Sequence, residues 1–440
     1  MAIIYQPSLF SWKDVDDLGD LERLQLVIEN MPDQPLLATL KSFRGRGRNT
    51  HEVESMWNSV LAGVVFQHPS IESLRRELRR NAQLREMCGF EPLKGSKAVP
   101  SKSAYNRFIK NIIKHAVLID EMFNNIVSQL QAILPGFGKD LAFDSKAISS
   151  WARATGNLTD DNRGDHEADY GTKTYRGTNK DGTNWEKVKT WFGYKLHLVV
   201  DANYELPVAK RVTKASLHDT PVMKEMFAQI AKDHPGLLES CDHGIGDKGY
   251  DDTALIIDLM AKYNIKAVID IRNMWKDDKD KTRTLKSHQY KNVTHDYKGT
   301  VFCHCPQTGE VRKMVFGGFE KDREALKYRC PALEYGLECK GAAQCPIRKG
   351  VRIKLSEDYR IFTPVARSSY KWKRIYNKRS SVERVNSRIE TSFGFDKHFI
   401  RGMAKMQMRC SLALCVMLSM ALGRAKQNKY EQMRSLVKAA

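Results

Sequence analysis

The spacing of apolar residues changes near residue 140 of this 440-residue chain. Before that point they recur at helical intervals between cap signals, as in residues 53–66 and 71–80, and a long apolar helix is predicted at 112–134. After it, short alternating runs typical of strands come first and helical stretches follow. The sequence therefore predicts an all-α N-terminal domain, ending at Pro135-Gly136, and then an α/β domain.

One helix of the N-terminal domain is a candidate for contacts with nucleic acid. It is predicted to begin at Pro100-Ser101 and follows two short helices, which is the order of elements in a helix-turn-helix. Ser103, Asn106 and Arg107 would then lie on the recognition helix. A solvated basic helix face explains the same residues, so both interpretations stay open.

Three predicted strands precede any helix in the α/β domain, at 141–143, 192–200 and 206–212. Helices are predicted at 219–232 and 252–263 and a buried strand at 265–271, which gives the order βββαβαβ. Between Trp151 and Trp185 the chain is polar and rich in Gly, Asp and Asn, and we predict a loop there. Asp219, next to His218, is expected to be an N-cap rather than a functional residue.

The α/β pattern is interrupted after residue 271 by a charged stretch and then by strand-like segments that carry cysteines. It resumes near Ile361 with a strongly basic helix and ends with an apolar helix, 406–422, that is predicted to pack on the sheet. The chain is therefore divided into a helical domain with the candidate DNA-binding helix (1–136), the first part of the α/β core (137–271), a Cys-containing β-rich insertion (272–358), the second part of the core (359–425) and a basic tail (426–440).

Charge indicates the kind of partner. Lys and Arg number 72 against 52 Asp and Glu, which gives a net charge of +20, as expected of a protein that neutralises phosphates. Nucleic acid is the leading partner, and a basic protein without a special partner, or one on an anionic membrane, is the alternative. No apolar stretch is long and uninterrupted enough to span a bilayer, so we expect a cytosolic protein without membrane association.

Three acids are candidates for a site that cleaves phosphodiester bonds. Cleavage through two metal ions needs carboxylates that converge on cations about 4 Å apart, and Mg²⁺ prefers such oxygen ligands. Asp144 ends one short apolar run and Asp247 follows another, so both are expected at strand ends. A turn or cap role is the alternative for each, and three other acids compete locally with Asp247, namely Asp242, Asp251 and Asp252.

The third acid, Glu383, lies on a helix that is otherwise cationic. Residues 367–409 contain 12 Lys or Arg and only three acids. An i,i+4 ion pair with Arg379 is a simple explanation for Glu383, but it leaves the rest of the helix face unexplained. Polar residues continue along that face at helical spacing, a pattern typical of a functional site, and they are Tyr376, Arg379, Glu383, Asn386 and Glu390.

The pattern Tyr376-x2-Arg379-x3-Glu383 resembles the signature around the catalytic glutamate of bacterial insertion-sequence transposases of the DDE type. Four further segments resemble blocks of that family in the same order, at 143–146, 192–197, 215–219 and 246–251, so the resemblance covers roughly residues 140–402. The family pattern continues with a Lys seven residues after the glutamate, where this chain has Glu390.

The resemblance implies an RNase H-like catalytic domain, a mixed sheet flanked by helices. Asp144 and Asp247 would bridge two Mg²⁺ ions, for which Mn²⁺ can substitute, and Glu383 would complete the set. The resemblance also implies that residues near the cut contact DNA phosphate. Either Arg384 or Arg388 replaces the missing Lys, or this subgroup of the family manages without it. The candidate phosphate-contacting residues are Tyr376, Arg379, Lys195, Lys248, Arg384 and Arg388.

The implied activity is binding of the terminal inverted repeats of the protein's own element, followed by DNA strand cleavage and strand transfer. The implied partner is double-stranded DNA, as transposon ends and target, bound by a homodimer in the cytoplasm in association with the nucleoid. An inactive or domesticated DNA-binding relic, or a metal-dependent nuclease without strand transfer, is the alternative.

Five of the nine cysteines lie within 43 positions of the insertion, together with His304. Such a cluster in a cytosolic protein indicates a structural Zn²⁺ site. Small buried residues in a β-rich insertion are the alternative, because the spacing is irregular. The cysteines concerned are Cys303, Cys305, Cys330, Cys339 and Cys345.

Overall fold

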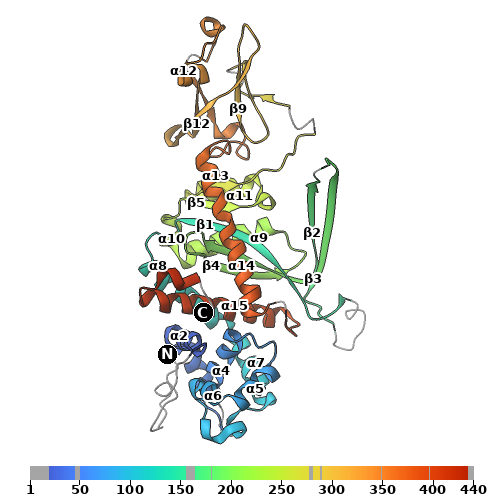
Figure 1. The fold of residues 1–440 in the computed structure, drawn as a ribbon, viewed down its shortest axis with the longest axis vertical. Coiled ribbons are helices and arrows are strands. Elements are labelled where there is room, and N and C mark those ends of the chain that lie inside the picture. Colours follow the sequence, from blue (N-terminus) through green and yellow to red (C-terminus); the bar gives the residue numbers. More distant parts are fainter. Residues whose placement is uncertain are drawn as a thin grey trace.

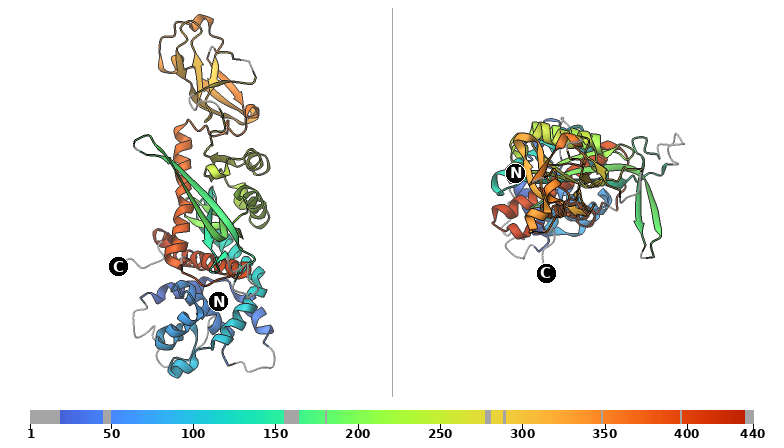
Figure 2. Two further views of the ribbon diagram at one scale, coloured as in Figure 1. Left: turned by 90° about the vertical axis from the view of Figure 1, so that its right-hand side faces the viewer. Right: turned by 90° about the horizontal axis from the view of Figure 1, so that it is seen from above.

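The computed structural model describes residues 19–44, 50–154, 164–179, 181–276, 281–287, 290–347, 349–395 and 397–434. The protein is elongated, with a helical region at one end, a sheet flanked by helices in the middle and a small β-rich region at the other end (Figure 1). The views in Figure 2 show the same succession along the long axis.

The N-terminal region is helical, as predicted. Trp57 is fully buried and its indole N–H donates to Asp33 at 2.7 Å. The helix predicted at 112–134 is in fact divided at His115, where the backbone leaves the helical conformation. The helices are α2 (Leu21–Asn30), α3 (Gln34–Ser42), α4 (Val53–Val65), α5 (Ile71–Arg80), α6 (Ala82–Cys88), η1 (Pro92–Ala98), α7 (Lys102–Lys114) and α8 (Ala116–Ile133).

The central sheet has six strands in the order β2-β3-β1-β5-β6, with β4 also paired to β3. Its first strands are antiparallel, whereas β1, β5 and β6 are parallel. This mixed sheet flanked by helices confirms the predicted fold class. The strands are β1 (Asp140–Ser149), β2 (Asp169–Thr178), β3 (Asn184–Asp201), β4 (Leu206–Lys214), β5 (His243–Gly246) and β6 (Lys266–Ile269).

Two layers of helices cover the sheet. On one face Phe143 of β1 packs edge-on against Phe227 and Tyr250. On the other face a long helix lies against β1 and β3. The first layer contains α9 (Asp219–Asp233), α10 (Pro235–Glu239) and α11 (Thr253–Tyr263), and the second contains α13 (Tyr370–Tyr376), η7 (Asn377–Arg379) and α14 (Ser380–Phe393).

The prediction of a loop between Trp151 and Trp185 is wrong for most of the residues that the structure describes there. β2 and the first half of β3 pair from Asp169↔Gly193 to Thr178↔Asn184 and form a long hairpin that projects from the sheet (Figure 1). Residues 172–175 and 184–190 are all exposed, so this hairpin buries no apolar face and lacks the alternation from which strands are predicted.

The insertion forms a separate β-rich region. Its strands make two small sheets, in the orders β10-β9-β8-β7 and β11-β12-β13, and it has its own apolar core around Tyr328 and Phe362. The elements are β7 (Arg283–Thr284), β8 (Val293–His295), β9 (Val301–His304), β10 (Val311–Lys313), β11 (Val315–Glu320), η4 (Lys321–Arg323), β12 (Ala325–Arg329), α12 (Pro331–Tyr335), η5 (Ala342–Gln344), β13 (Gly350–Lys354) and η6 (Leu355–Glu357).

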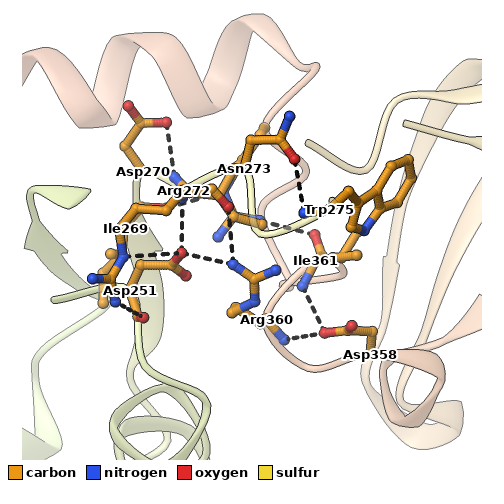
Figure 3. Close-up of polar contacts among 11 residues, drawn as sticks. Asp251, Ile269, Asp270, Arg272, Asn273, Trp275, Asp358, Arg360 and Ile361 are labelled. Atoms are coloured by element: carbon orange, nitrogen blue, oxygen red, sulfur yellow. Dashed lines mark hydrogen bonds and ion pairs between the residues drawn. The ribbon is translucent and has the colours of Figure 1, made fainter. Parts of the chain in front are cut away.

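A buried carboxylate fixes the base of the insertion to the sheet (Figure 3). Asp251 is fully buried, and its Oδ2 accepts hydrogen bonds from the Arg272 backbone N–H and from Nη1 of Arg360, both at 2.8 Å. Arg367 is partly buried beside them and donates to the carbonyls of Ile269 and Ile361. The two chain segments that lead into and out of the insertion are thus held together at one point.

The last long helix, α15 (Met403–Lys426), packs against α2, α4 and α8 as well as against β4. The helix α15 therefore packs on the sheet, as predicted, but it also packs against the N-terminal helices. By length and composition α15 alone among the described helices is apolar enough to cross a membrane. However, 83% of its apolar 18-residue stretch is buried inside the protein, as in a core helix. A short turn, η8 (Tyr430–Arg434), follows it.

Candidate active site

Strand register brings Asp144 and Asp247 together. β1 and β5 are parallel and pair Asp140 with His243 and Ala142 with Ile245. Asp144 and Asp247 each lie two residues further along, so the same register places them side by side, on strands about 4.8 Å apart. Asp144 shares a strand face with Lys146, which pairs with Glu390 of α14, so Asp144 faces the α14 layer.

The backbone around Asp247 is constrained. A Cβ atom on Gly246 would lie 2.5 Å from Cε2 of Phe143, so glycine is needed for this packing. The Asp247 carboxylate accepts a hydrogen bond from the Gly249 N–H at 2.7 Å. The competing acids have other partners, because Asp242 lies near Lys139, Asp251 is buried at the insertion and Asp252 caps α11.

The two carboxylates destabilise each other's charge. Burial raises the pKa of Asp144, and the nearby Asp247 raises it further to about 6, although Lys173 and Arg379 act in the opposite direction. Below them the buried Tyr250 hydroxyl has a pKa well above its ordinary value because of burial and then of Asp144. The raised pKa of Asp144 and the closeness of a second carboxylate suit a divalent cation, which would stabilise both negative charges.

Glu383 lies in the first turn of α14 and its carboxylate is half exposed. It pairs with Nη1 of Arg379 at 2.8 Å, and Arg379 is also close enough to Asp144 for the two charges to interact. The guanidinium of Arg379 therefore interacts with both Glu383 and Asp144. Among the described residues, no three His, Cys, Asp or Glu side chains are placed to hold a metal ion together, so Glu383 does not meet the aspartates in this conformation.

The remaining residues of the polar helix face also have defined partners. Tyr376 stacks on Trp372, with ring centroids 4.5 Å apart, and Arg379 approaches its ring at 5.9 Å. Glu390 pairs with Lys146 of β1. The family that the sequence resembles has a Lys at this position of the helix. This chain instead has an acid there, Glu390, and the Lys that pairs with it lies on the neighbouring strand.

Two arginines predicted to contact DNA also lie against a buried carboxylate. Arg384 and Arg388 approach Glu205, in the turn between β3 and β4, at 2.7 and 3.1 Å. The Arg388 side chain is only 12% exposed and also donates to the Glu205 carbonyl. This arrangement gives both arginines a role in fixing α14 to the sheet.

The two predicted phosphate-contacting lysines differ in accessibility. Lys195 donates to Asp219 and to the Leu217 carbonyl, both at 2.9 Å, and its side chain is 14% exposed. Lys248 is 61% exposed and lies 3.3 Å from Asp270. The predicted N-cap role of Asp219 is wrong, because the helix begins at Asp219 itself and the carboxylate binds Lys195 and Ser145.

Asp270 was not recognised as a site residue from the sequence. β5 and β6 pair Gly246 with Ile269, so Asp270 follows β6 at the same level as Asp247 follows β5. It is near enough to Tyr376 to help raise the pKa of that hydroxyl, after burial. The signal was the same as for Asp144 and Asp247, an acid directly after an apolar run.

The candidate DNA-binding helix α7 is amphipathic. Tyr105, Phe108 and Ile112 are buried, whereas Ser103, Asn106 and Arg107 are exposed. Ser101 caps the helix by accepting from the Ala104 N–H at 3.2 Å. The predicted contact residues are therefore accessible to a partner.

The five insertion cysteines line one small cavity of about 20 Å³. Burial, and then Cys330, raise the pKa of Cys303 to about 11, which shows that these thiols lie near one another. The Thr308 hydroxyl and backbone N–H groups lower the pKa of Cys305 to about 6, so this thiol is readily ionised. His304 turns toward Thr294, at 2.9 Å. The other cysteines are buried core residues, as expected, and they are Cys88, Cys241, Cys410 and Cys415.

A buried ion pair joins β1 to η7 and gives a prediction about stability. Burial raises the pKa of Asp140, but the contacts with His243 at 2.7 Å and Lys378 at 2.5 Å outweigh it and lower the pKa to about 2. The ordinary value is 3.8, so the ion pair stabilises the fold fully above about pH 4 and progressively less as the pH falls toward 2.

Asp140→Asn is therefore expected to lower the free energy of unfolding by about 2 kcal/mol near neutral pH. In chemical denaturation the difference from the wild type should shrink below about pH 4. Asp242→Asn, at a surface pair, is the control and should change stability by less than about 1 kcal/mol. An equal loss at every pH would show that Asp140 acts by packing alone.

Comparisons with known proteins agree with this geometry. A mixed sheet with acids at the ends of adjacent parallel strands and a polar helix across them defines an RNase H-like nucleic-acid enzyme. The profile of the family Transposase DDE domain matches residues 169–419, more than half of the chain, and the chain belongs to this family. Asp247 and Glu383 lie inside the matched range and Asp144 precedes it. The family cleaves DNA during transposition, so the protein is an enzyme.

Three further comparisons add detail. The profile Transposase domain (DUF772) matches residues 13–111, in the helical region. No curated protein matches. Among solved structures, the piggyBac transposase synaptic complex with hairpin DNA is similar at 12% identity and a TM-score of 0.39, over 96% of this chain and 80% of that chain.

Proposed function

We propose that the protein is an active transposase that binds the terminal inverted repeats of its own element, cleaves there and transfers the freed strand to a target. Asp144, Asp247 and Glu383 are the catalytic acids in this proposal. The observation that supports it best is the register of β1 on β5, because it aligns two carboxylates whose charges repel. Such a pair is unfavourable unless a cation is bound between them.

Asp144 and Asp247 would hold Mg²⁺, or Mn²⁺ in its place. When bound, such ions polarise the scissile phosphate and activate a water or a 3′-hydroxyl. Arg379 has a planar guanidinium suited to a phosphate, with Tyr376 beside it. A phosphate on Arg379 would compete with Glu383 for the guanidinium, and Glu383, half exposed, would then turn toward the aspartates and complete the set.

Recognition of the element's end would use the exposed face of α7, with Ser103, Asn106 and Arg107. Lys248 would contact phosphate near the cut because its side chain is largely exposed. Two ends must be brought together before strand transfer, so we expect a homodimer on DNA, acting at the nucleoid in the cytoplasm.

The test uses purified full-length protein, labelled DNA carrying candidate end sequences, and Mg²⁺. The proposal expects a cut at the end of the element and, with target DNA present, covalently joined products. Binding without cutting would support an inactive relic. Cutting without joined products would indicate a nuclease without strand transfer.

We further propose that the cysteine cavity binds one structural Zn²⁺. Five thiols line this cavity, and the Cys305 thiol is readily ionised, which zinc binding requires. No three of them are placed to hold a metal ion in this conformation, so zinc binding would draw them together. Metal analysis of protein purified under reducing conditions should find about one Zn²⁺ per chain, and Cys303→Ser/Cys345→Ser should lose it. Cys241→Ser, outside the cavity, is the control and should keep it. Metal-free protein with reduced thiols would contradict this proposal.

A further inference from the structure

The β2–β3 hairpin sorts its side chains by chemistry onto two faces. Paired residues of an antiparallel ladder lie on the same face, and Lys173 pairs with Lys189 and Tyr175 with Lys187. Two tryptophans share that face. We call it the lysine–tryptophan face, and it consists of Lys173, Tyr175, Trp185, Lys187, Lys189 and Trp191.

The opposite face has a different character. Thr172 pairs there with Thr190, and Thr174 with Val188. Between positions 171 and 177, and between 185 and 191, every position of the lysine–tryptophan face is Gly, Lys, Tyr or Trp, so the face itself carries three lysines and no acid. One face of the hairpin is thus cationic and aromatic.

The two indole rings lie flat on glycines. A Cβ atom on Gly171 would lie 2.3 Å from Cζ2 of Trp191, and one on Gly177 would lie 2.5 Å from Cε2 of Trp185. Any larger residue at either glycine would displace the ring. Trp191 is also fixed by a hydrogen bond to the Tyr194 carbonyl at 3.1 Å, whereas Trp185 is 42% exposed and presents an open ring surface.

No other part of the described chain covers this face. Residues 172–175 and 184–190 are exposed, and Tyr175, Trp185 and Val188 are among the exposed large hydrophobic residues of the protein. The hairpin stands away from the body of the molecule in Figure 1 and in the view from above in Figure 2. Exposed aromatic residues at this density indicate an interaction surface.

The hairpin is connected to the acid site through Gly193, at its base. A Cβ atom there would lie 2.2 Å from the Ile148 carbonyl oxygen, so this close approach of β3 to β1 requires glycine. Lys173 is near enough to Asp144 for the two charges to interact. Lys173 thus connects the lysine–tryptophan face to the acid site.

We propose that the lysine–tryptophan face binds the DNA strand that enters the acid site, with its lysines on phosphates and Trp185 stacked on an unpaired base. Lysines interleaved with open aromatic rings are the pattern by which proteins hold unpaired strands. Four residues of strand separate Lys173 from Gly177, which is roughly 13 Å, or about four nucleotide steps at duplex spacing. The inference rests on the proposed function, which supplies the DNA.

The test measures DNA binding by fluorescence anisotropy with the full-length chain carrying Asp144→Asn, so that no DNA is cut. Two labelled substrates are compared, an end sequence that is fully paired and one with unpaired bases within about six nucleotides of the expected cut. Trp185→Ala should weaken binding of the unpaired substrate by about 5- to 150-fold and leave the paired one nearly unchanged. Val188→Ala, on the opposite face, is the control.

The lysines are tested by salt dependence. Lys187→Gln/Lys189→Gln should weaken binding of both substrates and reduce the slope of log affinity against log salt by roughly 1.4 to 1.8. Lys232→Gln/Lys262→Gln, exposed on α9 and α11, is the matched control and should leave the slope unchanged. Unchanged binding in both hairpin variants would overturn the inference, and equal losses on both substrates for Trp185→Ala would overturn the stacking. If the parent chain binds neither substrate, the proposed function itself fails.

Discussion

Asp144→Asn and Asp247→Asn are each expected to reduce Mg²⁺-dependent DNA cleavage by about 10³-fold or more. Each replacement removes a carboxylate that would hold the cations, and cations of this kind contribute several kcal/mol of transition-state stabilisation. Glu383→Gln is expected to have an effect of similar size. The measurement is the single-turnover rate of cleavage of labelled end DNA, with DNA binding measured in parallel.

DNA binding should stay close to that of the wild type in all three variants, because these acids lie outside the N-terminal helices that are proposed to recognise the DNA end. Asp242→Asn is the matched control, since this residue also lies near a strand end but pairs with Lys139 at the surface. Asp270→Asn separates two explanations of the acid at the end of β6. A small effect would limit Asp270 to orienting Lys248, from which it lies 3.3 Å. Cleavage retained by Asp144→Asn or Asp247→Asn would refute the assignment.

Glu205→Gln is expected to destabilise the protein by about 3 to 5 kcal/mol. Glu205 is 5% exposed and its carboxylate faces Arg384, Arg388 and Arg434 at 2.7, 3.1 and 3.4 Å. Removing the charge leaves three guanidinium groups without their shared partner, two of them on α14. Because α14 carries Glu383, cleavage should also fall even at temperatures where the variant is folded.

Circular dichroism during denaturation and the cleavage rate would measure the two effects of Glu205→Gln. Glu225→Gln, which removes a surface partner of Arg211, is the control and should cost less than about 1 kcal/mol. Normal stability in Glu205→Gln would show that the arginines are adequately solvated. Normal stability combined with weaker DNA binding would indicate that Arg384 and Arg388 contact DNA.

The helices and strands that could be predicted from the sequence are those whose buried faces make apolar residues recur at regular intervals. The helix at 71–80, the helix from Asp219 and the strand near 265–271 all bury one face or both, so their apolar residues repeat regularly. The alignment of Asp144 with Asp247 could be expected only through strand order, and that order came from the resemblance to a family. The sequence alone does not show which residues of two neighbouring strands pair with each other.

What could not be predicted depends on contacts between distant residues. Arg388 and Glu205 are 183 positions apart, so nothing local showed that the arginine was already paired. Asp219 had the local signal of a cap, but Lys195 of β3 determines the position of its carboxylate. The β2–β3 hairpin was missed because it is exposed on both faces and holds its strands together by backbone pairing.

The position of α15 has a consequence for the order in which the protein can be made. Its residues lie near the end of the chain, yet they fill the apolar space between α2, α4 and α8, which are synthesised first. Until that segment has been translated, the early helices must leave apolar surface in water. A nascent chain therefore cannot complete the packing of its N-terminal helices until α15 has been made.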